Sequence, residues 1–176
     1  MTAPDAMLRP LPDAARVWLF PLDRTLDGAA ADALRQSLAD WLPTWRSHGR
    51  PVQAAAEVLA GRVLAVGAAI SPEEMNAGVS GCGIDAMERA VAAALGRAGV
   101  GLAPALSVVY RDESGAWETV SRPAFRRLVR EGAAGADTVV LDATAETVGA
   151  LRQHGAERPA GAAWHGHVFR LPAPTA

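Results

Sequence analysis

The sequence predicts an α+β fold, with a ferredoxin-like β-α-β-β-α-β core over residues 12–111 and a small C-terminal α/β extension over residues 112–171. Two observations lead to this prediction. Short apolar runs that are typical of strands alternate with two alanine-rich segments whose larger apolar residues recur at helical spacing. A glycine between the second and third runs suits a hairpin. The extension is expected to pack on the core, so that the 176 residues form one compact unit.

The first strand and the first helix open the core. Residues 16–20 combine β-branched, aromatic and leucine side chains, which is typical of a strand. Asp27 is a good N-cap for the helix that follows, and Pro43 should end or kink that helix near Trp41. The apolar stripe of the helix consists of Leu34, Leu38, Trp41 and Trp45, at positions i, i+4, i+7 and i+11. A loop is expected over residues 47–51.

A hairpin and a second helix complete the core. Residues 52–60 and 62–69 flank Gly61 and are expected to pair as two strands. A loop opens at Ser71-Pro72-Glu73-Glu74, and a helix follows it. The apolar face of this helix consists of Ile84, Met87, Val91 and Leu95. Residues 106–110 are the expected fourth strand, in one antiparallel sheet with the other three and with both helices on one face.

The extension is predicted to consist of short elements. Residues 117–120 are expected to pair with the fourth strand, and Ser121 should cap a short helix that stops at Gly132. The apolar residues of that helix are Phe125, Leu128 and Val129. We expect a strand at residues 138–141, a short helix at residues 145–152 and a last extended segment at residues 164–169.

The composition excludes some functions. Seventeen basic residues against nineteen acidic ones do not provide the basic face of a duplex-DNA binder. All basic residues are arginine, so the chain lacks the lysine of a Walker-A loop and of Schiff-base or pyridoxal-phosphate chemistry. The single cysteine fits a reducing compartment, and the longest stretch without a charge, Ala98 to Tyr110, is far short of the ~20 residues that span a bilayer. We expect a cytoplasmic protein with no cofactor and no membrane partner.

The most informative local feature is Ser80-Gly81-Cys82-Gly83-Ile84-Asp85, at the start of the second helix. A thiolate or a bound anion is favoured at a helix N-terminus, which indicates a reactive thiol at Cys82 or an anion-binding nest. The nest would use Ser80, Gly81, Gly83 and Asp85. A thiol nucleophile needs a base, and His48 is the candidate. The alternative is a helix-entry turn in which Ser80 or Asp85 caps the helix and Cys82 packs as a small apolar residue.

Arginines gather on the helix of the extension, at Arg122, Arg126, Arg127 and Arg130. They could bind phosphate, RNA or an acidic partner, and the alternative is a solvated helix face. A ferredoxin-like sheet that binds RNA carries exposed aromatic residues on its central strands. Here the first strand offers Trp18 and Phe20 without that pattern, so a nucleic-acid partner is not expected.

Two histidines, His165 and His167, stand two residues apart in the last expected extended segment. Alternate residues of a strand point to one face, and a pair of histidines there can supply two metal ligands. The sequence offers no third ligand nearby and places Gly166 between the two histidines, which favours an irregular edge strand. No metal site is therefore predicted.

Several separated pieces of the chain resemble one family. These pieces are Arg16-Val17-Trp18, Asp23-Arg24, Trp45-x-x-His48-Gly49, Ser80-Gly81-Cys82-Gly83-Ile84-Asp85 and Trp164. Together they resemble a small bacterial family, prominent in Bacteroidetes, whose members are often labelled "ABC transporter ATPase". The block around Cys82 carries most of the resemblance, although Gly83 stands where the family usually has serine. The resemblance implies a site at residues 80–85 and at His48.

The label does not carry an activity over to this chain. The chain has no Walker-A lysine, no recognisable Walker-B strand and no ABC signature, so it is not expected to be a P-loop ATPase. The sequence favours a non-catalytic binding or adaptor protein whose partner is an unknown protein or a small anion, and which could form a homodimer. The alternative is a thiol-dependent enzyme or a redox-responsive protein that uses Cys82.

Overall fold

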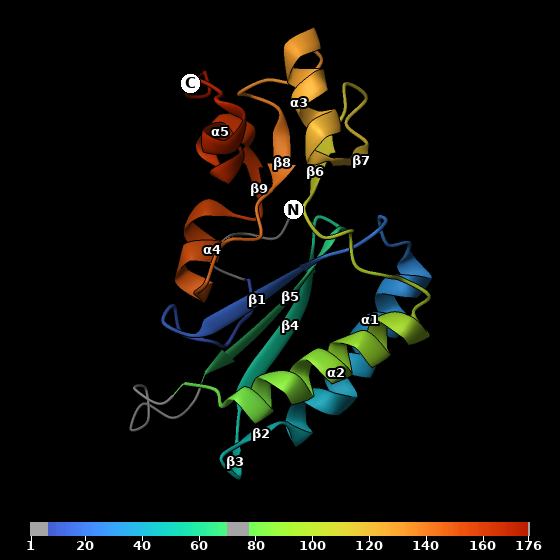
Figure 1. The fold of residues 1–176 in the computed structure, drawn as a ribbon. Helices are drawn as coiled ribbons and strands as arrows, with labels where there is room; N and C mark the ends of the chain where they lie inside the picture. Colours follow the sequence, from blue (N-terminus) through green and yellow to red (C-terminus); the bar gives the residue numbers. More distant parts are fainter. Residues whose placement is uncertain (1–6, 70–77, 176) are drawn as a thin grey trace.

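The computed structural model describes residues 7–69 and 78–175 (Figure 1). Its helices are α1 (Gly28–Trp41), α2 (Gly81–Arg97), α3 (Arg122–Glu131), α4 (Val148–His154) and α5 (Trp164–Phe169), with short 3-10 turns at Leu42–Thr44 and Ala160–Ala162. Its strands are β1 (Arg16–Pro21), β2 (Arg46–Ser47), β3 (Arg50–Pro51), β4 (Gln53–Leu59), β5 (Val63–Ala69), β6 (Ser107–Arg111), β7 (Trp117–Ser121), β8 (Val139–Leu141) and β9 (Glu157–Pro159). Across these two described ranges, no helix has both the length and the apolar character to cross a membrane.

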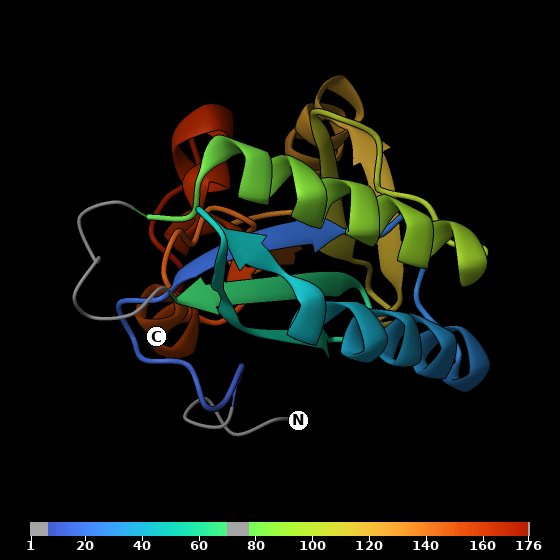
Figure 2. The same cartoon turned by 90° about the horizontal axis from the view of Figure 1, so that it is seen from below.

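The first sheet is antiparallel, with the strand order β1-β5-β4. Val66 in the central strand lies opposite Trp18 of β1 on one side and opposite Ala56 of β4 on the other. The predicted hairpin is confirmed: β4 and β5 are joined by a tight turn in which Ala60 and Gly61 both have positive φ. Helices α1 and α2 lie side by side across one face of this sheet (Figure 2).

The helices follow their predicted apolar stripes. In α1, Leu34 and Leu38 are fully buried, and the helix ends at Trp41 because Pro43 interrupts its hydrogen bonds. Trp45 leaves the helix and continues in an extended conformation, yet it is buried in the same core. In α2 the buried residues are Gly83, Met87, Val91, Ala94 and Leu95. Most of the helix stability comes from burying these faces against the sheet.

The second sheet has the strand order β7-β6-β8-β9, and it overturns the prediction of one four-stranded sheet. The expected fourth strand forms as β6, but it pairs with β7 and β8 rather than with β1. Directly after α2, the chain meets the end of β1 at the bridge between Leu22 and Leu102 and then turns away. Both faces of β6 are covered in this second sheet, where Val108 and Val109 are buried in two different core clusters.

The elements after β6 contact both sheets. Phe125 of α3 and Phe169 of α5 pack together on the second sheet, with their ring centroids 4.9 Å apart. Helix α4 instead packs on the second face of the first sheet, where Leu151 joins Val17 and Ala65. A bridge between Arg16 and Thr147 also ties β1 to the residue before α4. The chain therefore crosses between the sheets more than once.

The last predicted extended segment is wrong, because residues 164–169 form helix α5. Six residues are too few for their apolar pattern to distinguish a strand from a short helix. Here the buried side chains, His165 and Phe169, stand at i and i+4, as on one face of a helix. Gly166 permits a close approach, since a Cβ atom there would lie 2.6 Å from the carbonyl oxygen of Gly161. The loop expected at Ser71-Pro72-Glu73-Glu74 lies outside the described residues.

Candidate functional site

The sequence motif around Cys82 forms the first turn of α2. Ser80 is the N-cap: its Oγ accepts the N–H of Gly83 at 3.1 Å, and its carbonyl oxygen accepts the N–H of Ile84 at 2.9 Å. The predicted helix-entry turn is therefore present. Cys82 is exposed, and so is Asp85. The Cys82 thiol is accessible to solvent and does not pack as an apolar residue.

The strands β2 and β3 bring the second motif of the sequence against this turn. His48 and Gly49 occupy the tip between these strands, both with positive φ, and His48 is exposed. The preceding Ser47 is buried, and its Oγ accepts the backbone N–H of Ser80 at 2.9 Å. The Ser47 hydroxyl also donates to Ser80 Oγ at 3.2 Å. These bonds fix the start of α2 to the chain that leaves α1.

Trp45 adds a third bond to this junction. Its indole N–H donates to the carbonyl oxygen of Gly83 at 3.0 Å. A Cβ atom at Gly83 would lie 3.0 Å from Val79 Cγ1 and 3.2 Å from Ser80 Oγ, so the position has little room for a side chain. The close packing of this junction thus explains why residue 83 is a glycine.

Neither Cys82 nor His48 takes part in the hydrogen bonds described for this junction. Ser80 and Gly83 are brought together, but they bond to each other and to their neighbours. No hydrogen bond or ion pair joins the two described residues Cys82 and His48. Among the described residues, Cys82 therefore has an accessible thiol and no base that is hydrogen-bonded to it.

A second candidate site lies on the outer edge of β4. The N–H of Val52 donates outward to the carbonyl oxygen of Trp45 at 3.1 Å, and backbone groups of alternate residues face the same edge. Ala54, Ala56 and Val58 therefore present their N–H and C=O groups outward. No strand in the described part of the chain pairs with them. This edge offers a row of free backbone donors and acceptors.

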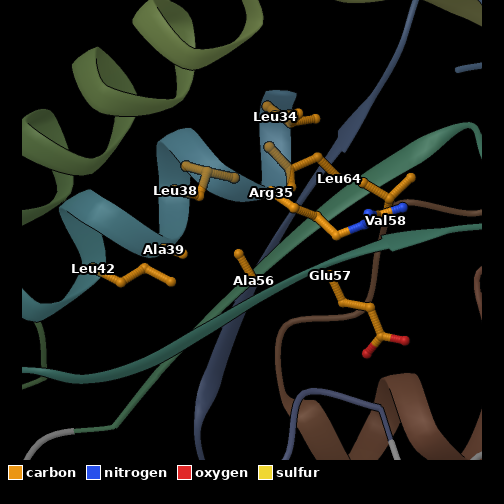
Figure 3. Close-up of a pocket in the computed structure, with 9 residues that line it drawn as sticks. All are labelled: Leu34, Arg35, Leu38, Ala39, Leu42, Ala56, Glu57, Val58 and Leu64. Carbon is orange, nitrogen blue, oxygen red and sulfur yellow. The ribbon is translucent and has the colours of Figure 1, made fainter. Parts of the chain in front are cut away.

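Beside this edge, a cavity of about 200 Å³ opens between α1 and β4 (Figure 3). Leucines of the α1 segment face Ala56 and Val58 across it; the lining residues are Leu34, Arg35, Leu38, Ala39, Leu42, Ala56, Glu57, Val58 and Leu64. The carboxylate of Glu57 points away from the cavity, to the other side of the sheet, where its Oε2 accepts the N–H of Leu8 at 2.9 Å. Apart from Arg35, which pairs with Asp32, the walls of the cavity are therefore apolar.

His165 is the one titratable ring that the structure buries completely among the described histidines. Neither of its ring nitrogens has a hydrogen-bond partner, and the ring stacks on Trp164 with the centroids 3.8 Å apart. Burial lowers the pKa of His165 to about 4; the Arg122 cation acts in the same direction, and Asp142 opposes both. His167 is exposed on the opposite side of α5, so the two histidines do not form a metal-ligand pair.

Metal binding has no support elsewhere in residues 7–69 and 78–175. No group of three or more histidine, cysteine, aspartate or glutamate side chains there could hold a metal ion.

Sequence reasoning missed the edge of β4, whose backbone groups carry no motif. Its signal was compositional: residues 53–59 contain no proline and only one charged residue, Glu57.

No family model matches the chain, and neither a curated protein nor a solved structure gives a significant match.

Proposed function

We propose that this protein is a non-catalytic binding protein that docks an extended, apolar segment of a partner protein along β4. One observation carries the proposal: the outward backbone groups of Ala54, Ala56 and Val58 have no partner strand in the described chain and lie beside an apolar cavity. An extended peptide that adds to a sheet edge gains main-chain hydrogen bonds, and a neighbouring pocket for one side chain gives specificity.

The edge of β4 lacks most of the devices that protect sheet edges. Natural proteins place prolines, lysines or bulges on an exposed edge, or cover it with another element. The other edge strand of the sheet, β1, is covered in this way at both ends, by the bridges from Leu102 and Thr147. Strand β4 has the single charge of Glu57, whose side chain is already used by the N–H of Leu8. This asymmetry supports β4 as the edge that receives a partner.

The arrangement of the first sheet supports the same assignment. Three strands in the order β1-β5-β4, with two helices on one face, correspond to a ferredoxin-like sheet without its fourth strand. The place of that strand is beside β1, where the two bridges stand. We therefore assign partner binding to the opposite edge, which no described segment occupies.

The size of the cavity favours a peptide with a large apolar side chain. A second copy of this chain, paired edge to edge, would present the side chains of Ala54, Ala56 and Val58 to the same face of the sheet. These side chains are too small to fill a cavity of about 200 Å³. A leucine, methionine or phenylalanine of a partner fits the space between Leu38 and Ala56 better. Homodimerisation through β4 is the competing outcome.

Selection from a library of random extended peptides tests the proposal. Peptides recovered on the immobilised protein are expected to share one large apolar residue. They are expected to lose at least about tenfold in affinity towards Ala56→Pro, which removes an outward N–H while sparing the pairing with β5. Ala39→Trp, which fills the mouth of the cavity, should weaken binding as well. Ala33→Trp is the matched control, because Ala33 is also exposed on α1 but does not line the cavity.

Three results would overturn the proposal. One is a library that yields no binder. Another is a set of binders that tolerate both Ala56→Pro and Ala39→Trp. The third is a concentration-dependent dimer, seen by analytical ultracentrifugation, that Ala56→Pro abolishes, because the edge would then belong to a second copy.

A thiol-dependent activity at Cys82 is the second candidate function. The supporting observation is the exposure of the Cys82 side chain in the first turn of α2. His48 remains its candidate base and Ser80, Gly81, Gly83 and Asp85 its candidate anion site. Both candidate functions suit a protein of the reducing cytoplasm, which we propose as its location.

A further inference from the structure

A cavity of about 380 Å³ lies where the two sheets meet. Its walls come from the end of β1, the linker between α2 and β6, the end of β8, and the first residues of α3 and α5. The lining residues are Pro21, Ala103, Pro104, Ala105, Leu106, Ser107, Val109, Arg122, Leu141, Ala143, Thr144 and Trp164. Most of these side chains are apolar. The volume of the cavity falls in the range of roughly 300–1,000 Å³ that small-molecule sites occupy.

One cation stands in this apolar wall. The guanidinium of Arg122 lies over the ring of Trp164, 4.8 Å from its centroid. No described residue accepts a hydrogen bond from Arg122 or forms an ion pair with it, and its Nε atom is buried without a partner. A buried N–H group without an acceptor is costly, so this arginine is incompletely satisfied by the described residues around it.

Asp142, which acts together with Arg122 on the pKa of the buried His165, already has other hydrogen-bond partners. Asp142 receives the guanidinium of Arg158 on Oδ2 at 2.7 Å and the hydroxyl of Thr144 on Oδ1 at 2.6 Å. Arg122 is also the first residue of α3, where the helix dipole disfavours a cation. The charge of Arg122 is therefore not compensated by the described residues around the cavity.

Leu106 marks the mouth of the same cavity. Its side chain is 70% exposed and its φ is +62°, a left-handed conformation that is strained for leucine. It lines this cavity and a neighbouring one of about 440 Å³, and Arg122 lines both. An exposed, strained apolar residue at a rim is typical of a binding site, because both its exposure and its strain cost stability.

We propose that this junction binds a small apolar carboxylic acid, such as an aryl or branched-chain acid, whose carboxylate pairs with the guanidinium of Arg122. The apolar body of the ligand lies against Leu106, Leu141 and Val109, and Ser107, which lines the same cavity, supplies a second polar contact. The fork of an arginine suits a carboxylate because it donates two parallel N–H bonds. The site is separate from the edge of β4 and does not depend on peptide binding there.

A pair of isosteric probes tests the proposal on the full chain. Naphthalene-1-acetate carries the carboxylate, and naphthalene-1-acetamide has the same shape without the charge. Calorimetry is expected to show that the acid binds at least about tenfold more tightly than the amide. The acid should also shift the NMR signals of the Arg122, Ser107 and Thr144 amides. Because this comparison uses the native protein, it does not depend on the folding of a variant.

Two variants then assign the preference to one residue. Arg122→Gln should reduce the affinity for the acid to that for the amide, while Arg127→Gln should leave it unchanged. Arg127 is the matched control, since it is exposed on the same helix and lines neither cavity. The proposal is overturned if the acid and the amide bind equally, if neither binds, or if a folded Arg122→Gln protein keeps the preference.

Discussion

The indole N–H of Trp45 donates to the carbonyl oxygen of Gly83 across the junction between the chain that leaves α1 and the start of α2. Trp45 is 1% exposed, and its ring lies 5.2 Å from that of Trp41 and 6.2 Å from that of Trp18. One side chain thus anchors the turn that carries Cys82 to the core of the first sheet. The motifs around His48 and Cys82 meet at this bond.

Two glycines of the same turn provide a matched test of this packing. Gly83→Ala should destabilise the protein by about 1–2 kcal/mol, because the new Cβ would press on Val79 and Ser80. Gly81→Ala should be neutral or slightly stabilising, since nothing lies within 4 Å of a Cβ there. Urea unfolding of both variants measures the difference. Equal free energies of unfolding would show that the junction has room to adjust.

Amide hydrogen exchange reports directly on the edge of β4. The amides of Ala54, Ala56 and Val58 point outward, where no described strand pairs with them, and should exchange rapidly. Those of Ala55 and Glu57 point to β5 and should be protected. Residue-resolved NMR exchange rates in the free protein check this alternation. Uniform protection along β4 would mean that another segment covers the edge, and the docking proposal would then fail.

The buried ring of His165 makes stability depend on pH. Its pKa is lowered from 6.5 to about 4 in the folded protein, so the unfolded chain binds the proton more readily. The contribution is fully present above pH 6.5 and is lost as the pH falls towards 4, by about 3 kcal/mol in total. Urea unfolding between these pH values should show the loss. It should be absent in His165→Leu and unchanged in His167→Ala, whose side chain is exposed. A His165→Leu protein with the native pH profile would contradict the assignment.

Alkylation of Cys82 separates the two candidate functions. Because the side chain is exposed, iodoacetamide should modify the native protein about as fast as the unfolded chain. A native rate well above the unfolded rate below pH 7, lowered in His48→Asn, would instead support thiol chemistry. A rate near zero until denaturant is added would contradict both the exposure of Cys82 and the thiol hypothesis.

Local patterns predicted most of the elements but not their partners. The stripe of Leu34 and Leu38 gave α1, and the Ser121 cap with Gly132 at the end gave α3. The choice of β6 to pair with β8 instead of β1 depends on which neighbours cover its two faces, and residues 106–110 carry no sign of this. Residues 164–169 form a helix and not the expected extended segment, because the pattern of six residues fits both a strand and a helix.

The candidate sites also consist of local features, which the sequence predicts, and features of the assembled fold, which it does not. Ser80 as a helix cap is a local property, and the sequence was sufficient to predict it. The lack of a counter-ion for Arg122 is not local. It follows from the arrangement of the assembled second sheet, in which Asp142 pairs with Arg158 and no described acid pairs with Arg122. The open edge of β4 likewise follows from the arrangement of the whole sheet.

The bridge between Arg16 and Thr147 has a consequence for how the chain acquires its structure. The N–H of Val17 donates to the carbonyl oxygen of Glu146, and the N–H of Val148 donates to the carbonyl oxygen of Ala15. The first strand is therefore fully bonded only when residues near the end of the chain are present. Contacts between segments so distant in sequence form slowly, because a long loop must close first. During synthesis, β1 stays incomplete until α4 has emerged. A chain cut after Arg111 would leave β6 without both of its partner strands. We therefore expect the two sheets to fold and unfold in one cooperative step.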